Sequence, residues 1–362
     1  YAARTAFILM YGLLVRVGIE GTGSYGAGLA RHLTALGHQV IEVIRPNRQL
    51  RRLSGKSDPI DAYAAARTAL TESNQPTPKS GDGAIEQIRY LFTARKSAIK
   101  ARTAAQVQIK SLLVTAPTLL RERFRAMADA ALITSLADFD IRPYPEHQGV
   151  VIALRALARR HRYITAEIHS LDQELNTLTE HTNPALIAAS GVGSVTAAQL
   201  LITAGDNPDR LRSEAAFAAL CGVSPIPASS GKTSRHRLNR GGDRHANSAL
   251  HRIALVRMSH DARTKAYVEK KRAEGKGNKE IIRCLKRAIA REVFTLLTKN
   301  VEVPRVDDLR PFRKALGVTL QQAAAHFNVW ATKISRIERE LTRDDEFTLA
   351  YREWLETTAP QN

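Results

Sequence analysis

The chain has 362 residues, 44% of them hydrophobic and 25% charged, which is enough for two or three domains with proper hydrophobic cores. Lysine and arginine number 54 against 35 aspartate and glutamate residues, so the net charge is +19. Because the basic residues recur in clusters along the chain, this balance predicts an extended polyanion as partner and argues against an ordinary small-molecule enzyme.

The first apolar run, AFILMYGLLV at residues 6–15, follows Arg4 and is typical of a signal-peptide core. No small-x-small cleavage site follows it, and it leads directly into the next pattern, so we expect a buried strand instead. No stretch of the sequence is long enough and apolar enough to span a membrane, and no membrane partner is predicted.

A strand, a glycine-rich loop and a short helix come next. Residues 15–19 alternate as in a half-buried strand, and a second strand, residues 40–44, carries Glu42. The loop between strand and helix matches G-x-G-x-x-G through Gly21, Gly23 and Gly26. This is the fingerprint of dinucleotide binding, so an NAD(P)-dependent oxidoreductase is one hypothesis for the function.

Three carboxylates favour a different hypothesis. Glu20 ends the first strand, directly before the first glycine, where its charge would face an incoming pyrophosphate. Asp58 and Asp61 lie three residues apart, on one face of the next helix. One acid at a strand end and two on a nearby helix is the layout with which ribonuclease-H-like nucleases hold Mg²⁺. The alternative is that Asp58 and Asp61 cap the helix, with Pro59 as its first residue.

Two long helices are predicted at residues 84–116 and 147–182, after a polar linker at residues 71–83. In the second helix, apolar residues recur in alternating steps of four and three, with His161 as a polar interruption. The heptad positions are Val150, Leu154, Leu157, His161, Ile164, Ile168, Leu171, Leu175 and Leu178. This pattern predicts either an intramolecular helical hairpin or a coiled coil between protomers, and His161 is interpreted as solvated or register-setting.

Two segments of the second half of the chain suggest nucleic-acid contacts. Gly191 and Gly193 interrupt two apolar helices, as in a helix-hairpin-helix whose backbone N–H groups meet a phosphate; a plain glycine turn is the alternative. Ser229 and Ser230 lie in a loop bounded by proline and glycine. Basic residues follow this loop closely: Lys232, Arg235, His236, Arg237, Arg240 and Arg244.

A serine hydroxyl that attacks a phosphodiester needs help to lose its proton and cations around the charged transition state. The basic cluster would supply the cations, and metal held by the carboxylates would help the serine to lose its proton. An ordinary surface loop is the alternative. Cys221 and Cys284 lack C-x-x-C spacing, which predicts no structural zinc and a reducing compartment.

Residues 309–340 predict two short helices with a small core. Thr319 and Gln322 form a capping box for the first of them. The core positions are Ala323, Phe327, Val329, Ile334 and Ile337. The segment is similar to the helix-turn-helix of phage-repressor-like regulators, and a small helical bundle for protein contacts is the alternative. The likeness implies that its second helix meets a major groove through Thr332, Lys333, Ser335, Arg336 and Arg339.

Three motifs carry a family resemblance that extends over residues 15–300: GIEGTGSYG, SGKSDPIDA and a proline-to-Ser-Gly motif from Pro225 to Gly231. Together they resemble the DEDD-type transposases of the insertion-sequence-110 family. Members of that family pair a RuvC-like domain with a domain that carries a nucleophilic serine, and they act as oligomeric recombinases guided by a bridge RNA. By position, Glu20, Asp58 and Asp61 correspond to family carboxylates that bind Mg²⁺.

The resemblance makes Ser230, directly before a glycine, the expected nucleophile, with Ser229 as the second choice. It also shows a departure, because the family's first aspartate lies well upstream of the glutamate. In this chain Asp58 is the first aspartate, and Tyr1 stands where a full-length protein would have methionine. We therefore expect a truncated copy with an incomplete metal site.

The expected fold class is α/β plus α. A partial ribonuclease-H/RuvC-like domain is assigned to residues 1–78, a helical coiled-coil spacer to 79–182, an α-rich serine transposase domain to 183–303 and a helix-turn-helix to 304–362. The expected function is DNA transposition by strand cleavage and rejoining. The expected partners are DNA, a structured guide RNA and further copies of the chain, in the prokaryotic cytoplasm at the nucleoid. A non-catalytic DNA-binding protein descended from a transposase is the main alternative.

Overall fold

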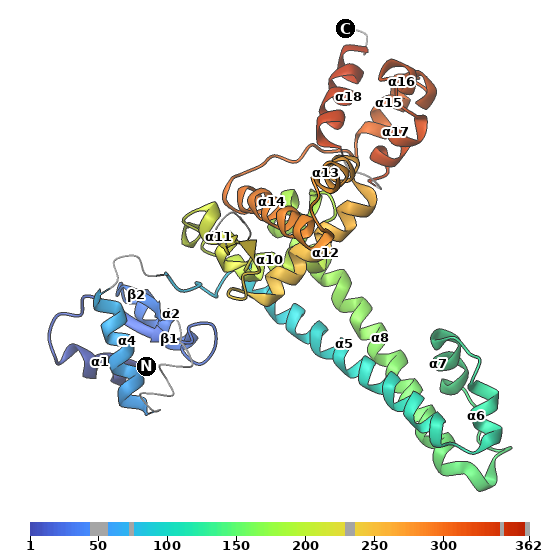
Figure 1. Ribbon diagram of the computed structural model, residues 1–362, viewed down its shortest axis with the longest axis horizontal. Helices are drawn as coiled ribbons and strands as arrows, with labels where there is room; N and C mark the ends of the chain where they lie inside the picture. The colour runs from blue at the N-terminus through green and yellow to red at the C-terminus, as the bar shows by residue number, and fades with distance from the viewer. Residues whose placement is uncertain (44–56, 72–75, 229–235, 341–343, 359–362) are drawn as a thin grey trace. The chain divides into compact units, whose positions relative to one another are not determined.

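The computed structural model describes residues 1–43, 57–71, 76–228, 236–340 and 344–358 (Figure 1). These residues form two compact units. The first contains residues 1–179 together with 205–207, and the second contains residues 180–204 and 208–362. Helices predominate in both, and the described strands form two sheets of two strands each. The four-domain division drawn from the sequence stays a prediction.

The first unit contains a β-α-β element. Strand β1 (Val17–Glu20) pairs in parallel with β2 (Val40–Val43), and α2 (Ala27–Ala35) connects them. Ile19 and Val40 on one face of the sheet pack against Leu33 of α2. Helix α4 (Asp58–Thr71) packs against both strands on the side of Gly18. The predicted order of strand, glycine loop, helix and strand is therefore confirmed.

The prediction of a buried strand at residues 6–15 was wrong. Helix α1 (Ala2–Leu9) takes up the first part of the run, and Met10, Tyr11, Leu13 and Val15 are exposed. Tyr1, directly before the helix, places its ring against Gly28 of α2. A helix satisfies its backbone groups internally, whereas a strand here would need a neighbour, and none of the described strands pairs with this run.

Both predicted long helices are present, as α5 (Ala84–Thr115) and α8 (Gln148–Thr182). The heptad seam of α8 packs against α5 of the same chain, where Ile164 and Ile168 meet Ala98. Further along, Leu154 and Ile109 share a core with the short helices α6 (Thr118–Phe124) and α7 (Asp129–Ala137). A 3₁₀ turn, η1 (Pro145–His147), leads into α8. Of the two alternatives, the intramolecular hairpin is the one that the structure contains.

The second unit has a helical core around α12 (Arg244–His260) and α14 (Asn278–Thr298). Phe217, Leu250 and Ile289 are among its buried residues. The surrounding elements are α9 (Pro184–Ala188), α10 (Ser194–Ala204), η2 (Pro208–Arg210), α11 (Glu214–Leu220), β3 (Ile226–Pro227), β4 (His236–Arg237) and α13 (Ala262–Ala273).

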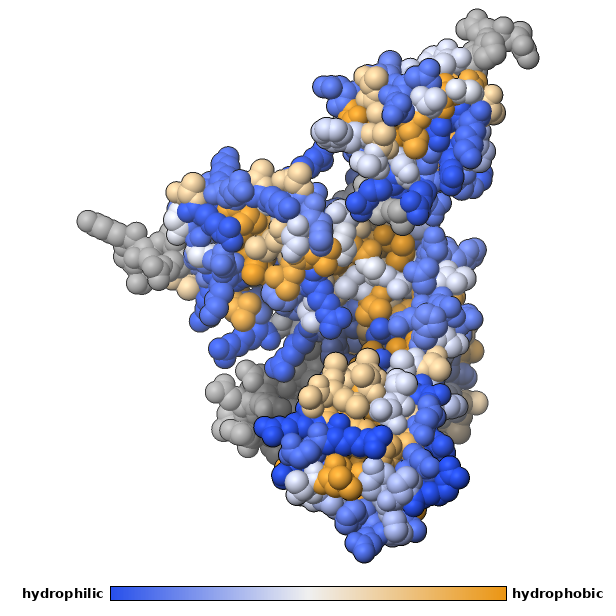
Figure 2. All heavy atoms as spheres, turned by 90° about the vertical axis from the view of Figure 1, so that its right-hand side faces the viewer, coloured by the Kyte–Doolittle hydropathy of each residue, from blue (hydrophilic) through white to orange (hydrophobic). Residues whose placement is uncertain are grey.

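Four short helices end the described chain: α15 (Leu309–Ala315), α16 (Leu320–His326), α17 (Ala331–Glu338) and α18 (Asp345–Thr358). Tyr351 and Leu355 of α18 are fully buried against Ile334 of α17. Hydrophilic residues predominate on the face seen in Figure 2, with hydrophobic areas between them. Within the described ranges, no helix combines the length and apolar character that crossing a membrane needs.

Candidate active site

The carboxyl end of β1, in the first compact unit, is one candidate site, and the packing of α4 fixes what surrounds it. A β-carbon on Gly18 would lie 2.6 Å from the carbonyl oxygen of Ala65, so α4 touches the strand backbone here. Arg16, directly before the strand, donates a hydrogen bond to the carbonyl oxygen of Ala69 at 3.2 Å. Helix α4 therefore runs antiparallel to β1 in close contact.

From this packing we infer that Asp61 lies near Glu20. Two residues of a strand span about 6.6 Å, and four residues of a helix span about 6 Å. Arg16 contacts Ala69, and Gly18, two residues later, contacts Ala65, four residues earlier. The next step of the same size leads to Glu20 and Asp61. Alternate strand residues share a face, so Glu20 points to the side of Gly18, which α4 covers. Glu20 and Asp61 are both half-buried.

Asp58 lies nearly one turn before Asp61 and is exposed. The capping interpretation placed Asp58 directly before the helix, with Pro59 as the first helical residue. In the structure, α4 begins at Asp58 itself. Glu42 lies on the other face of the sheet, that of Val40 and Ile19, and so does not join Glu20. No set of three metal-ligating side chains is present among the described residues.

The glycine loop folds tightly over the end of β1. The carbonyl oxygen of Gly21 accepts hydrogen bonds from the N–H groups of Ser24 (2.8 Å) and Gly26 (3.1 Å), and Gly21 has a φ of +70°. A β-carbon at Gly26 would lie 2.8 Å from the carbonyl oxygen of Glu20. The glycines thus allow α2 to begin directly above the strand end, next to Glu20.

The serine loop, in the second compact unit, is a separate candidate site. Strands β3 and β4 form the base of a hairpin, with Pro227 opposite His236. Ser229, Ser230, Lys232 and Arg235 belong to residues 229–235, which lie outside the described residues. The remaining predicted cations follow β3 and are exposed: Arg237, Arg240 and Arg244.

A rigid turn connects the hairpin to α12. Gly242 has a φ of +80°, and a β-carbon there would lie 2.6 Å from the backbone nitrogen of Gly222. Asp243 is the N-cap of α12 and accepts hydrogen bonds from the N–H groups of His245 (2.8 Å) and Ala246 (3.3 Å). The Thr203 hydroxyl donates a hydrogen bond to the other carboxylate oxygen of Asp243 at 2.7 Å. Gly242 and Asp243 thus form a turn that leads directly into α12.

A basic pocket of about 430 Å³ opens at the base of the hairpin. Residues on both sides of the hairpin line it, together with α14. Lys286 of α14 is only 7% exposed, and its ammonium donates a hydrogen bond of 2.8 Å to Asn247 Oδ1. Burial lowers the pKa of this lysine, and the nearby Arg283 lowers it further. Sequence reasoning missed Lys286 and Asn247, although a lysine beside the apolar positions of α14 was a visible signal.

Two family models match these two parts of the chain. Residues 11–116, with β1, the glycine loop and both aspartates, match a DEDD-type transposase model for IS110. Residues 184–269, with the serine hairpin, match the model described as transposase IS116/IS110/IS902 family. The chain belongs to the IS110 transposase family. The dinucleotide-binding hypothesis loses its support, because the glycine loop falls within the transposase match.

Three curated relatives agree with this family assignment. The chain is 27% identical over 64% of its length to the transposase for insertion sequence element IS1328 of Yersinia enterocolitica, and 31% identical over 40% to an IS110 43.6 kDa protein of Streptomyces coelicolor. It is 24% identical over 63% of its length to an IS900 42 kDa protein of Mycobacterium paratuberculosis. These matches span 67%, 36% and 59% of the relatives' own lengths.

In this IS110-family chain, the predicted helix-hairpin-helix glycines make contacts within the protein. Gly191 has a φ of +73° and lies against α12, where a β-carbon would be 3.3 Å from the carbonyl oxygen of Ile253. The N–H of Gly193 donates a hydrogen bond to the Thr196 hydroxyl at 3.0 Å. A phosphate at the Gly193 N–H would have to replace that bond, and the role of both glycines in nucleic-acid binding stays a prediction.

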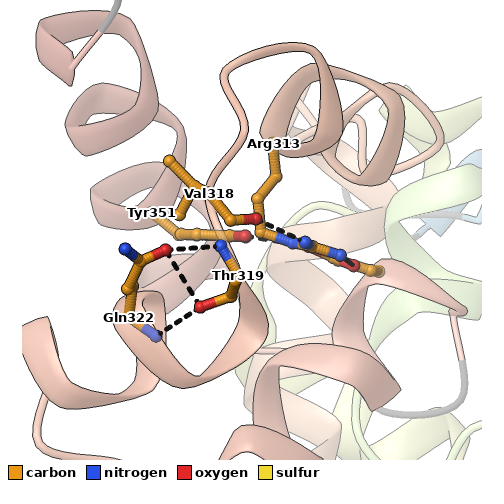
Figure 3. Close-up of polar contacts among 6 residues, drawn as sticks. Arg313, Val318, Thr319, Gln322 and Tyr351 are labelled. Carbon is orange, nitrogen blue, oxygen red and sulfur yellow. Dashed lines mark hydrogen bonds and ion pairs between the residues drawn. The ribbon is translucent and has the colours of Figure 1, made fainter.

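The predicted helix-turn-helix, whose second helix is the one expected in the groove, lies beyond both family matches. The capping box of α16 is present, because the Thr319 hydroxyl accepts from the Gln322 N–H at 3.1 Å and the Gln322 side chain accepts from the Thr319 N–H at 2.8 Å (Figure 3). On α17, Thr332 and Arg336 are exposed, whereas Ser335 is half-buried. The half-buried Lys333 pairs with Asp344 at 2.9 Å.

Proposed function

We propose that this chain is a DNA transposase that cleaves and rejoins strands of an insertion sequence, with Ser230 as nucleophile. The observation that carries the proposal is the presence in one chain of both transposase matches. The first contains the carboxylate end of β1, and the second contains the serine hairpin. A net charge of +19 suits a protein whose substrate is a polyanion.

The serine step is a phosphoryl transfer. Ser230 Oγ bonds to the phosphorus of a scissile phosphate and loses its proton, the bond from phosphorus to the leaving deoxyribose oxygen breaks, and that oxygen gains a proton. A hydroxyl of another strand then displaces the serine and rejoins the DNA. Exposed Arg237, Arg240 and Arg244, which flank the hairpin, suit the stabilisation of negative charge on the transferring phosphate.

The carboxylates fit a hard divalent ion. Mg²⁺ is commonly held by one or two carboxylates while waters and substrate phosphates complete its shell, and the pair Glu20 and Asp61 has this composition. Asp58, less than one turn along α4, provides a further oxygen ligand on the same side. When bound, Mg²⁺ supplies positive charge that stabilises phosphate oxygens and favours loss of the serine proton. Glu20 and Asp61 contribute by holding their negative charges at a fixed position beside the glycine loop.

The partners follow from the same family membership. DNA is the substrate, a structured RNA is the guide, and further copies of the chain complete the assembly, in the cytoplasm at the nucleoid. The C-terminal helices α16 and α17 are assigned to DNA, with Thr332, Lys333, Ser335 and Arg336 on the contacting helix. Engagement of Lys333 would compete with its ion pair to Asp344.

A covalent-adduct assay tests the function. Labelled insertion-sequence ends are incubated with the chain, Mg²⁺ and co-expressed flanking RNA, and protein-linked DNA is isolated under denaturing conditions. We expect an adduct that disappears with Ser230→Ala and persists with Ser229→Ala. An adduct that disappears only with Ser229→Ala would move the nucleophile by one residue. Salt-dependent DNA binding without any adduct would favour the non-catalytic DNA-binding protein instead.

A further inference from the structure

The pocket beside the serine hairpin carries far more positive than negative charge. Six cationic side chains line it: Arg237, Lys276, Arg283, Lys286, Arg287 and Arg291. Glu280 is the carboxylate among the described lining residues. Glu214, which does not line the pocket, pairs with Arg287 and with Arg291, the latter at 3.1 Å. The other four cations in the lining, Arg237, Lys276, Arg283 and Lys286, outnumber the one lining carboxylate among the described residues, Glu280. The pocket therefore suits an anionic group.

Lys286 is the side chain that a purely structural role explains least. It is 93% buried, since only 7% of it is exposed. An ammonium has three N–H donors. Within the described residues it donates to the neutral Asn247 amide, and no carboxylate forms an ion pair with it. A buried charge without a counter-charge destabilises a fold. Retaining a lysine here, where an apolar residue would pack, calls for a ligand that completes its hydrogen bonds.

The surroundings hold Lys286 in place for such a ligand. Asn247 of α12 donates from its amide to the carbonyl oxygens of Cys221 (3.0 Å) and Gly222 (2.9 Å), which fixes the orientation of its own oxygen toward the lysine. The same Gly222 turn packs against Gly242 at the start of α12. Asn247 therefore links Lys286 to the two turns from which the serine hairpin departs.

We propose that this pocket binds a phosphodiester group of a nucleic-acid strand, with the Lys286 ammonium as its positioning residue. The proposal rests on the proposed function, because it gives the strand that reaches the serine hairpin a fixed anchoring point. The bound phosphate supplies the negative charge and the acceptor oxygens that Lys286 lacks in the free protein. Binding at this site is electrostatic and independent of base sequence.

The test compares Lys286→Met with Lys279→Met, which removes an exposed charge from the same helix outside the pocket. Affinity for a labelled DNA duplex and for an RNA of matched length is measured across a salt series. We expect Lys286→Met to weaken binding about tenfold and to reduce the slope of log affinity against log salt by about one. The control should keep both nearly unchanged, and the RNA and DNA arms show which strand occupies the pocket.

Thermal unfolding of the same variants separates a ligand-binding lysine from a structural one. We expect Lys286→Met to raise the unfolding temperature of the free protein while binding falls, because a buried charge is replaced by an apolar chain of similar length. A lower unfolding temperature would overturn the proposal by making the lysine structural. Wild-type-like nucleic-acid binding by Lys286→Met would also overturn it. Absence of binding by the wild-type chain would instead refute the proposed function.

The two cysteines give an independent readout on unmutated protein. Cys284 is exposed and lines the pocket, whereas Cys221 is fully buried. Burial raises the pKa of the Cys221 thiol to about 12, so it stays unreactive and serves as an internal control. We expect bound DNA or RNA to slow alkylation of Cys284 by iodoacetamide. Equal alkylation with and without saturating nucleic acid would contradict occupation of the pocket.

Discussion

The carbonyl oxygen of Ala65 on α4 lies 2.6 Å from the position that a β-carbon on Gly18 of β1 would take. The missing side chain thus lets a helix rest on the backbone of a strand. Because α4 runs antiparallel to β1, this contact determines which helical residue lies beside each strand residue. Extended along both elements, the same packing predicts that Asp61 lies near Glu20, although the two are far apart in the sequence.

Replacing Gly18 with alanine should therefore disturb the carboxylate pair without touching it. The added carbon has to displace α4, and overpacking of this kind costs about 1–3 kcal/mol of the free energy of unfolding. Thermal unfolding measures the loss. The matched control is Gly23→Ala in the glycine loop, because nothing lies within 4 Å of a β-carbon there. Equal stability of the two variants would refute the close packing of α4 on β1.

Removal of one carboxylate should remove binding of the divalent ion. We expect Mn²⁺ or Mg²⁺ to bind the wild-type chain, and Asp61→Asn or Glu20→Gln to weaken that binding by about tenfold or more, since each removes an anionic oxygen ligand. Isothermal titration calorimetry, or the paramagnetic signal of Mn²⁺, measures the affinity. Glu42→Gln is the control, because Glu42 lies on the opposite face of the sheet. Equal losses in all three variants would indicate a general charge effect.

The C-terminal helices depend on one buried ion pair. Arg313 of α15 and Glu338 of α17 form two hydrogen bonds of 2.6 and 3.0 Å, and the Tyr351 hydroxyl donates to Glu338 at 2.8 Å (Figure 3). Arg313→Met would leave the Glu338 carboxylate buried and unpaired, which costs about 3–5 kcal/mol. Urea unfolding followed by fluorescence of the packed Trp354 measures this. Breaking the exposed pair of Arg305 and Asp307 by Arg305→Met should cost less than about 1 kcal/mol.

Local patterns in the sequence predicted the elements well, and long-range contacts were what they could not supply. The two residues of the capping box at Thr319, the glycines of the glycine loop and successive heptad positions of α8 are each only a few residues apart. These patterns could therefore be recognised from the sequence alone. The partner of the α8 seam was not evident, because α5 places Arg95 and Arg102 at seam positions where the pattern calls for apolar residues.

The candidate site divides in the same way. The Gly242–Asp243 turn has a short-range pattern, because the glycine stands directly before the N-cap residue of α12. The inferred proximity of Glu20 and Asp61 depends on how α4 lies against β1, and the burial of Lys286 depends on its packing beside α12. Neither arrangement has a short-range signature. The prediction of a buried strand at residues 6–15 was wrong for a related reason. Hydrophobicity alone does not distinguish a strand that pairs with a neighbour from an exposed helix.

His161 makes the helical hairpin sensitive to acid. Its imidazole is half-buried in the seam of α8, and burial lowers its pKa; the charge of Arg102 on α5 lowers it further, while Asp129 opposes the shift. A lowered pKa means that the folded hairpin binds a proton less readily than the unfolded chain. Its contribution to stability is therefore complete above about pH 6.5 and is lost as the pH falls through the lower value in the folded state.

Hydrogen exchange of α8 peptides across this pH range checks the expectation. After correction for the intrinsic pH dependence of exchange, the wild-type hairpin should lose protection as the pH falls below about 6.5, whereas His161→Gln should remain nearly constant. His169→Gln, on the exposed side of the same helix, should behave as the wild type. Acid-induced loss of protection that persists in His161→Gln would assign the sensitivity to carboxylates. The Arg95 pair with Asp172, which joins the same two helices, would then be the group to test next.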